Sequence, residues 1–265
     1  MQQAHDTLSA LRTVLAGLDP VAVATAGDLI PTGVASLDEP LGGGFRRAAL
    51  HETYPAAGIR DAAAAGGFGL GLALRAAGSR PLVWVQQDSL DGELGRISGA
   101  GVAAFGADPD RLVLVRVADH TGGLRAAREA LRCPALGAVL VEFRGASRIL
   151  DPTATRRLSF AASQSGVTLV MTRLGAWPGP SAAATRWSVA AAASLPLEAN
   201  APGRPAFALT LRRHRAGIPG RTWSVEWDCD RVSFADPAPL PRPVVSVPAG
   251  REAGTRGDGG WRLAG

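Results

Sequence analysis

Lysine is absent from this 265-residue chain, so apart from four histidines every positive side chain is an arginine. The formal net charge is +5. Arginine forks bind phosphate through paired hydrogen bonds, which would suit contact with nucleic acid. A GC-rich genome disfavours lysine codons everywhere, and we favour this explanation because it needs no function. Either way, a phosphate-binding loop that uses lysine is excluded.

Cysteines and long apolar runs are scarce too. Cys133 and Cys229 form neither a CxxC pair nor a zinc pattern, which is typical of reduced thiols in the cytoplasm. The N-terminus lacks a basic start followed by an apolar run, and no apolar run reaches ~18 residues. We expect a soluble cytoplasmic protein without a metal site. His51 and His120 are expected to be structural, and His214 to lie at the surface.

Apolar runs of strand length alternate with helical patterns along most of the chain. The runs lie at 47–54, 81–86, 111–117, 136–143 and 167–172. The helical patterns lie at 61–77, 90–105, 122–132 and 152–165. This alternation predicts an α/β fold with a mainly parallel sheet covered on both faces. After residue 185 the pattern changes, and we expect an antiparallel extension that includes 206–213 and 222–228.

Three segments are predicted from composition. An amphipathic helix is expected at 4–18, within an N-terminal helix and linker at 1–27. The α/β core follows at 28–236. Residues 237–265 are rich in Pro, Gly and Arg and poor in apolar side chains, which indicates a flexible tail.

Six collinear segments resemble the RecA recombinase core, over about residues 28–228. The first, IPTGVASLDEPLGGGF at 30–45, resembles the stretch that leads into the RecA phosphate-binding loop. The others are LHETYPAAG (50–58), VWVQQD (83–88), AVLVEF (138–143), TLVMTR (168–173), and TRWSVAA with LRRHRAGIPG (185–191 and 211–220). The resemblance implies a RecA-like core, with a twisted, mainly parallel sheet flanked by helices.

Within that superfamily the chain resembles the ImuA family of inducible-mutagenesis accessory proteins. The supporting segments are DAAAAGGF at 61–68, ATRRLSFAAS at 154–163 and RAGIPGRTWSVEWD at 215–228. That family is encoded beside a Y-family polymerase homologue, ImuB, and an error-prone replicative-type polymerase. The resemblance therefore implies a role in damage-induced translesion synthesis, with ImuB and RecA as partners.

The phosphate-binding loop is degenerate. A working loop needs G-x-x-x-x-G-K-[ST], whereas the aligned stretch runs from Pro55 through Gly58 to Ala62. Asp61 replaces the lysine and Ala62 replaces the hydroxyl residue that holds Mg²⁺. We expect the Asp61 carboxylate to cap the helix that follows and to repel a nucleotide. We therefore expect no cofactor and no ATPase activity, although Arg60 remains open as a substitute cation.

At the other positions of the RecA nucleotide site, two carboxylates are present and the sensor residue differs. Glu142 takes the place of the magnesium-binding carboxylate and Asp88 that of the catalytic carboxylate. Without a bound triphosphate a carboxylate has nothing to activate, so we interpret both as relics. Arg173 stands where the resemblance implies a polar sensor, usually Gln.

Two groups of residues are candidates for partner contact. Arg213 and Arg215 fall on positions where RecA carries two lysines that reach a neighbouring subunit's ATP, but a solvated strand end explains them equally well. The loop at 174–187 takes the place of a DNA-binding loop. Its Trp177, with Arg173 and Arg186 nearby, suits a nucleic acid or a protein interface. The protein interface is slightly favoured, and any DNA contact is expected to be indirect.

Taken together, these features predict a non-catalytic RecA-like adaptor in error-prone translesion synthesis. The alternative is a weak RecA-type ATPase, or a recombinase mediator that binds DNA, using Arg60. A regulator of cell division is a third possible class, but no residue of the sequence supports it.

Overall fold

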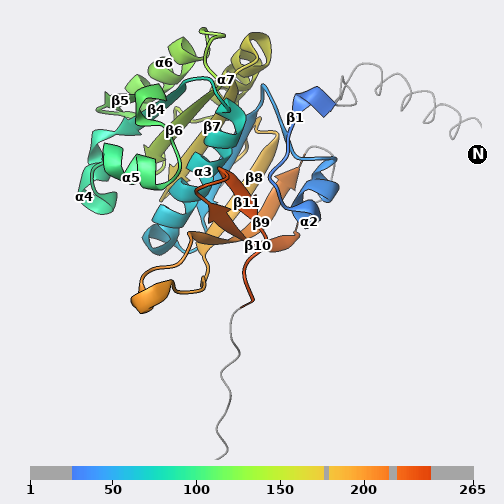
Figure 1. The fold of residues 1–265 in the computed structure, drawn as a ribbon. Coiled ribbons are helices and arrows are strands. Elements are labelled where there is room, and N and C mark those ends of the chain that lie inside the picture. The colour runs from blue at the N-terminus through green and yellow to red at the C-terminus, as the bar shows by residue number, and fades with distance from the viewer. Residues whose placement is uncertain (1–25, 176–178, 215–219, 240–265) are drawn as a thin grey trace, which may run out of the picture.

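The computed structural model describes residues 26–175, 179–214 and 220–239 (Figure 1). The helix expected at 4–18 and the tail from residue 240 onward lie outside the described residues. The helices are α2 Ala35–Asp38, α3 Ala62–Ala77, α4 Asp91–Leu94, α5 Gly99–Ala104, α6 His120–Ala130 and α7 Pro152–Ser165. Short 3₁₀ turns are η1 Ala26–Asp28, η2 Glu39–Leu41, η3 Gly58–Asp61, η4 Asp88–Leu90, η5 Pro109–Arg111 and η6 Glu198–Asn200.

Nine of the described strands form one sheet in the order β11-β10-β9-β8-β3-β7-β6-β4-β5. Their bounds are β3 Leu50–Pro55, β4 Leu82–Gln87, β5 Leu112–Val117, β6 Ala138–Arg144, β7 Thr168–Leu174, β8 Thr185–Ala191, β9 Ala206–His214, β10 Thr222–Asp228 and β11 Ser233–Ala235. The six strands from β8 to β5 run parallel, and β9 to β11 are antiparallel. Two short strands, β1 Leu29–Ile30 and β2 Phe45–Arg46, pair separately.

The predicted strands and helices are confirmed within a few residues, with two corrections. β8 belongs to the parallel part, because it pairs with β3 in parallel register, and the antiparallel extension begins only at β9. The helix predicted at 90–105 is two short helices, α4 and α5. Gly95 separates them with φ of +80°, a conformation that suits glycine and ends the first helix.

Two apolar cores lie on opposite faces of the sheet. α3 packs on one face, where its alanines and Phe68 meet Trp187, Trp227 and Phe234. α6 and α7 pack on the other face, over β4, β6, β7 and β3 (Figure 1). In the part of the chain that is described, no helix is long and apolar enough to span a membrane.

Glycines of helix α3 face the sheet at positions where a side chain would collide with it. A Cβ added at Gly71 would come within 2.8 Å of Phe234 Cζ and 3.0 Å of Trp227 Cζ3. A Cβ at Gly69 would come within 2.6 Å of Thr172 Oγ1. This close packing fixes the position of the α3 N-terminus relative to β3, where the degenerate loop lies.

Candidate functional site

The degenerate loop connects the end of β3 to the start of α3, and two of its backbone amides, those of Ala56 and Ala57, already have partners. The amide of Ala57 donates to Asp61 Oδ2 over 2.8 Å. The amide of Ala56 donates to the Val189 carbonyl of β8 over 2.8 Å. Asp61 Oδ1 accepts a further hydrogen bond, of 3.1 Å, from the amide of Ala191. The Asp61 carboxylate therefore satisfies one backbone amide of the loop and one of β8, the role that a bound anion would otherwise play.

This arrangement corrects one expectation. The Asp61 side chain makes no capping hydrogen bond to α3, although Asp61 is the residue that precedes the helix. Its oxygens instead bond the loop and β8, so its carboxylate ties β3, the loop and β8 together. Asp61 is 6% exposed, whereas Arg60 beside it is exposed.

Glu142 lies at the end of β6, buried beneath the first turns of α3. Its Oε2 accepts hydrogen bonds from Trp84 Nε1 (3.0 Å) and Gln86 Nε2 (3.1 Å). Burial raises the pKa of this carboxyl, and the two hydrogen bonds oppose that shift. A hollow of about 510 Å³ opens beside it, between α3 and the segment that holds α4 and α5. The described residues contain no group of three or more His, Cys, Asp or Glu that could hold a metal ion.

Asp88 follows β4 and forms an exposed ion pair with Arg116 of β5, with 3.0 Å between Oδ1 and Nε. The same guanidinium donates to Gln86 Oε1 and to Asp91 Oδ1. Gln86 thus links Arg116 and its two carboxylate partners to Glu142. The two carboxylates expected as relics are held in separate hydrogen-bonded settings, one exposed and paired with arginine, the other buried.

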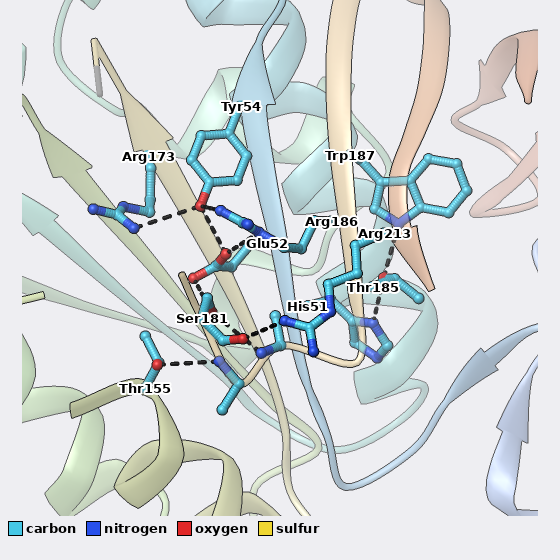
Figure 2. A network of polar contacts seen from close by, with 12 residues as sticks. His51, Glu52, Tyr54, Thr155, Arg173, Ser181, Thr185, Arg186, Trp187 and Arg213 are labelled. Atoms are coloured by element: carbon cyan, nitrogen blue, oxygen red, sulfur yellow. Dashed lines mark hydrogen bonds and ion pairs between the residues drawn. The ribbon is translucent and has the colours of Figure 1, made fainter. Parts of the chain in front are cut away.

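A buried polar network lies where β3, β7 and β8 run side by side (Figure 2). Glu52 accepts hydrogen bonds from Tyr54 Oη (2.7 Å), from Arg186 Nε (2.9 Å) and from Ser181 Oγ (2.8 Å). Arg186 Nη2 also donates to Tyr54 Oη over 2.6 Å. Burial and the Glu52 carboxylate raise the pKa of Tyr54 to about 12.

Arg186 and Arg173 are not on the surface, which corrects their prediction as interface residues. They are 8% and 5% exposed. Arg186 is buried because its guanidinium forms an ion pair with the buried Glu52 carboxylate. Arg173 has only a long contact of 3.5 Å to Tyr54 Oη, and its Nε has no hydrogen-bond partner among the described residues. The Glu52 carboxylate is therefore paired with Arg186, while Arg173 reaches this network only through Tyr54.

His51, on the other face of β3, belongs to a second chain of hydrogen bonds. Its Nε2 is 2.8 Å from the Arg46 carbonyl, and its Nδ1 is 2.8 Å from Thr185 Oγ1. Since a carbonyl only accepts, we assign the proton to Nε2, and Thr185 then donates to Nδ1. Trp187 Nε1 donates to the same hydroxyl over 2.8 Å. Burial lowers the pKa of His51 to about 4, so the ring is neutral and structural, as expected.

Arg213, at the end of β9, donates to the Ser181 carbonyl over 2.5 Å, and its side chain is otherwise exposed. Two of its expected companions, Arg215 and Trp177, lie outside the described residues. His214 beside it is half-buried, and burial lowers its pKa. Arg213 is thus tied to the 179–184 segment that Ser181 in turn ties to Glu52.

Sequence reasoning missed Glu52, Tyr54 and Ser181. A signal was present, because His51-Glu52-Thr53 places polar residues inside a strand expected to be buried on both faces. Such a run indicates buried partners, but it does not say which residues they are.

No family model matches the chain, and no curated protein sequence matches it. A crystal structure of the RadB recombinase matches with a TM-score of 0.51 and 16% identity, over 78% of this chain and 99% of that chain. At this identity the likeness shows a shared fold, and activity has to be argued from the site itself. With its mostly parallel sheet and flanking helices, this chain has a RecA-like α/β fold.

Proposed function

We propose that this chain is a non-catalytic RecA-like accessory protein of damage-induced, error-prone translesion synthesis. One observation carries the non-catalytic part, namely the Asp61 carboxylate bonded to the amides of Ala57 and Ala191. A triphosphate would have to displace this tethered anion, and the loop supplies neither the lysine nor the hydroxyl that would compensate. The setting in translesion synthesis is supported by the resemblance of the sequence segments to ImuA.

Nucleotide binding is the first test. A ligand at 100 times its dissociation constant stabilises a fold by about 2.7 kcal/mol, which a melting experiment detects. We expect millimolar Mg-ATP to leave the melting temperature unchanged and ATP hydrolysis to be unmeasurable. A clear upward shift would contradict the proposal.

The competing function is a weak RecA-type ATPase or recombinase mediator that uses Arg60. The specific observation in its favour is that Arg60 is exposed beside the loop and makes no ion pair with any described residue. It predicts a nucleotide-dependent melting shift that Arg60→Ala abolishes. Wild-type protein and Arg60→Ala melting alike with and without Mg-ATP would exclude it.

The proposed partners are RecA and the Y-family polymerase homologue ImuB, and through ImuB an error-prone replicative-type polymerase. Arg213 and Arg215 would complete a neighbouring RecA subunit's nucleotide site. We expect purified RecA to bind this chain more tightly with nucleotide than without. The double variant Arg213→Ala, Arg215→Ala should lose that preference. Binding that ignores both the nucleotide and the variant would leave the pair as a solvated strand end.

A further inference from the structure

A hollow of about 630 Å³ lies beside α7, on the sheet face opposite α3. It forms because α7 covers β7 and β3, while the sheet continues beyond them to β8 and β9. One wall is α7, and the other is the 180–184 segment with Arg213. Its lining is Arg46, Ala48, Ala49, Pro152, Arg156, Ser159, Phe160, Ser163, Pro180, Ser181, Ala182, Ala184 and Arg213. We call this surface the α7 groove.

The α7 groove carries positive charge without compensation. Three arginines line it, Arg46, Arg156 and Arg213, and no Asp or Glu does. Arg46 and Arg156 form no ion pair with any described residue, and Arg213 bonds a carbonyl rather than a carboxylate. Of the three serine hydroxyls in the lining, Ser181 already donates to Glu52 and Ser163 to the Phe160 carbonyl, which leaves Ser159 to donate to a ligand. Three cations converging on one hollow favour an anionic ligand, because their repulsion is relieved when it binds.

The rest of the lining is apolar. Phe160 is 65% exposed, the largest exposed fraction among the big apolar side chains described. Alanines and prolines form most of the remaining surface of the groove. An exposed aromatic ring above small apolar residues is suited to holding an apolar side chain between charged ones.

We propose that the α7 groove binds an acidic peptide segment of a partner protein, with carboxylates on Arg46 and Arg156 and an apolar side chain against Phe160. This inference rests on the proposed adaptor function and names the chemistry of the partner. Side-chain carboxylates pair with guanidinium forks in bidentate geometry, and the Ser159 hydroxyl can bond the peptide backbone.

A nucleic acid fits the α7 groove less well. Surfaces for single strands combine a basic track with several aromatic platforms on which successive bases stack. The α7 groove offers one aromatic ring and an alanine- and proline-lined floor, which has no plane for a second base. Its mixture of isolated cations and small apolar patches matches alternating acidic and apolar side chains instead.

The test is fluorescence anisotropy with a labelled heptapeptide, Asp-Glu-Asp-Leu-Asp-Glu-Asp. The control probes are its Asn/Gln counterpart and a labelled oligothymidine. We expect the acidic peptide alone to bind the full-length protein, with affinity falling as salt rises. The double variant R46Q/R156Q should weaken binding at least about threefold, as exposed ion pairs do. Phe160→Ser should weaken it further, and an Ala in place of the central Leu of the peptide should have no added effect in that variant.

Arg157→Gln is the matched control, because Arg157 is the next residue on α7, is also exposed and lines a different hollow, towards α6. It should bind the peptide as wild type does. Arg156→Glu provides a second variant in case Arg46→Gln disturbs the fold. Equal losses in Arg157→Gln, tighter binding of oligothymidine than of the peptide, or no peptide binding would each overturn the proposal. Arg213 lines the α7 groove and is also a proposed RecA contact, but none of these variants replaces Asp61, Arg213 or Arg215, and the peptide assay contains neither nucleotide nor RecA. A failure of peptide binding is therefore distinguishable from a failure of the proposed function.

Discussion

At the scale of single residues, burial of His51 couples stability to pH. The pKa is about 4 in the folded chain and about 6.5 when the ring is exposed. Between these values the unfolded chain binds more protons, so the free energy of unfolding falls as pH drops from about 6.5 to about 4. Above pH 6.5 the free energy of unfolding is therefore higher than at acid pH by about 3 kcal/mol on account of His51.

We therefore predict that His51→Gln flattens the pH dependence of stability between pH 6.5 and pH 4. The glutamine retains a donor for the Arg46 carbonyl but does not titrate in this window. Urea unfolding at several pH values measures the effect. An unchanged slope would mean that His51 is protonated in the folded state.

Glu142 is predicted to change stability with pH in the opposite direction to His51. Its pKa is raised by burial, so the folded chain retains a proton that the unfolded chain releases, and stability falls as pH rises above the ordinary carboxyl value. Glu142→Gln should remove this loss and stabilise the protein at neutral pH relative to wild type. The two proteins should converge at acid pH. If Glu142 still held a magnesium ion, wild type would instead gain stability from added Mg²⁺ and the variant would not.

The pair formed by Glu52 and Arg186 should respond very unevenly to substitution. Glu52→Gln leaves the buried Arg186 guanidinium without its carboxylate and should cost about 3–5 kcal/mol. Replacing both partners, by Glu52→Gln with Arg186→Met, should cost less than the sum of the single changes. Chemical denaturation of the three variants measures the coupling. Additive losses would show that the ion pair contributes nothing of its own.

At the scale of elements, α3 depends on the absence of side chains at Gly69 and Gly71. Alanine is a better helix former than glycine by about 1 kcal/mol, so propensity alone would make Gly71→Ala stabilising. Packing against Phe234 and Trp227 opposes this, and we predict a net loss of about 1–3 kcal/mol. Gly92→Ala is the control, since an added Cβ there meets nothing within 4 Å. A stabilising Gly71→Ala would show that α3 can move away from the sheet.

Most elements were predictable because each is specified locally. The 3.6-residue pattern of α7 and the apolar run of β6 mark their own boundaries. The direction of β8 was not predictable, since it depends on pairing with β3, more than a hundred residues earlier. The network around Glu52 could not be predicted for the same reason. Its partners Ser181 and Arg186 lie 129 and 134 residues away in the sequence. The degenerate loop was found because its signal is a short, contiguous stretch.

At the scale of the whole molecule, the core closes at β11, where the amide of Phe234 bonds the Thr32 carbonyl and its ring is buried. The composition after Pro237 offers little apolar surface to bury. We predict that a chain ending at Asp236 unfolds at the same temperature as the full chain. A drop of several degrees, or precipitation, would place the domain boundary further along.

The tethered carboxylate of Asp61 has a consequence for how such a protein would be controlled. A tethered side chain is present at a high effective concentration, so under the proposed function the shape of the loop would not follow the cell's supply of nucleotide. RecA-type proteins that bind and release a nucleotide can be switched by it. If this chain binds no nucleotide, as proposed, its own carboxylate takes the place of the anion and no such switch operates. Its influence on any partner would then be set by how many copies the cell makes and how long they last.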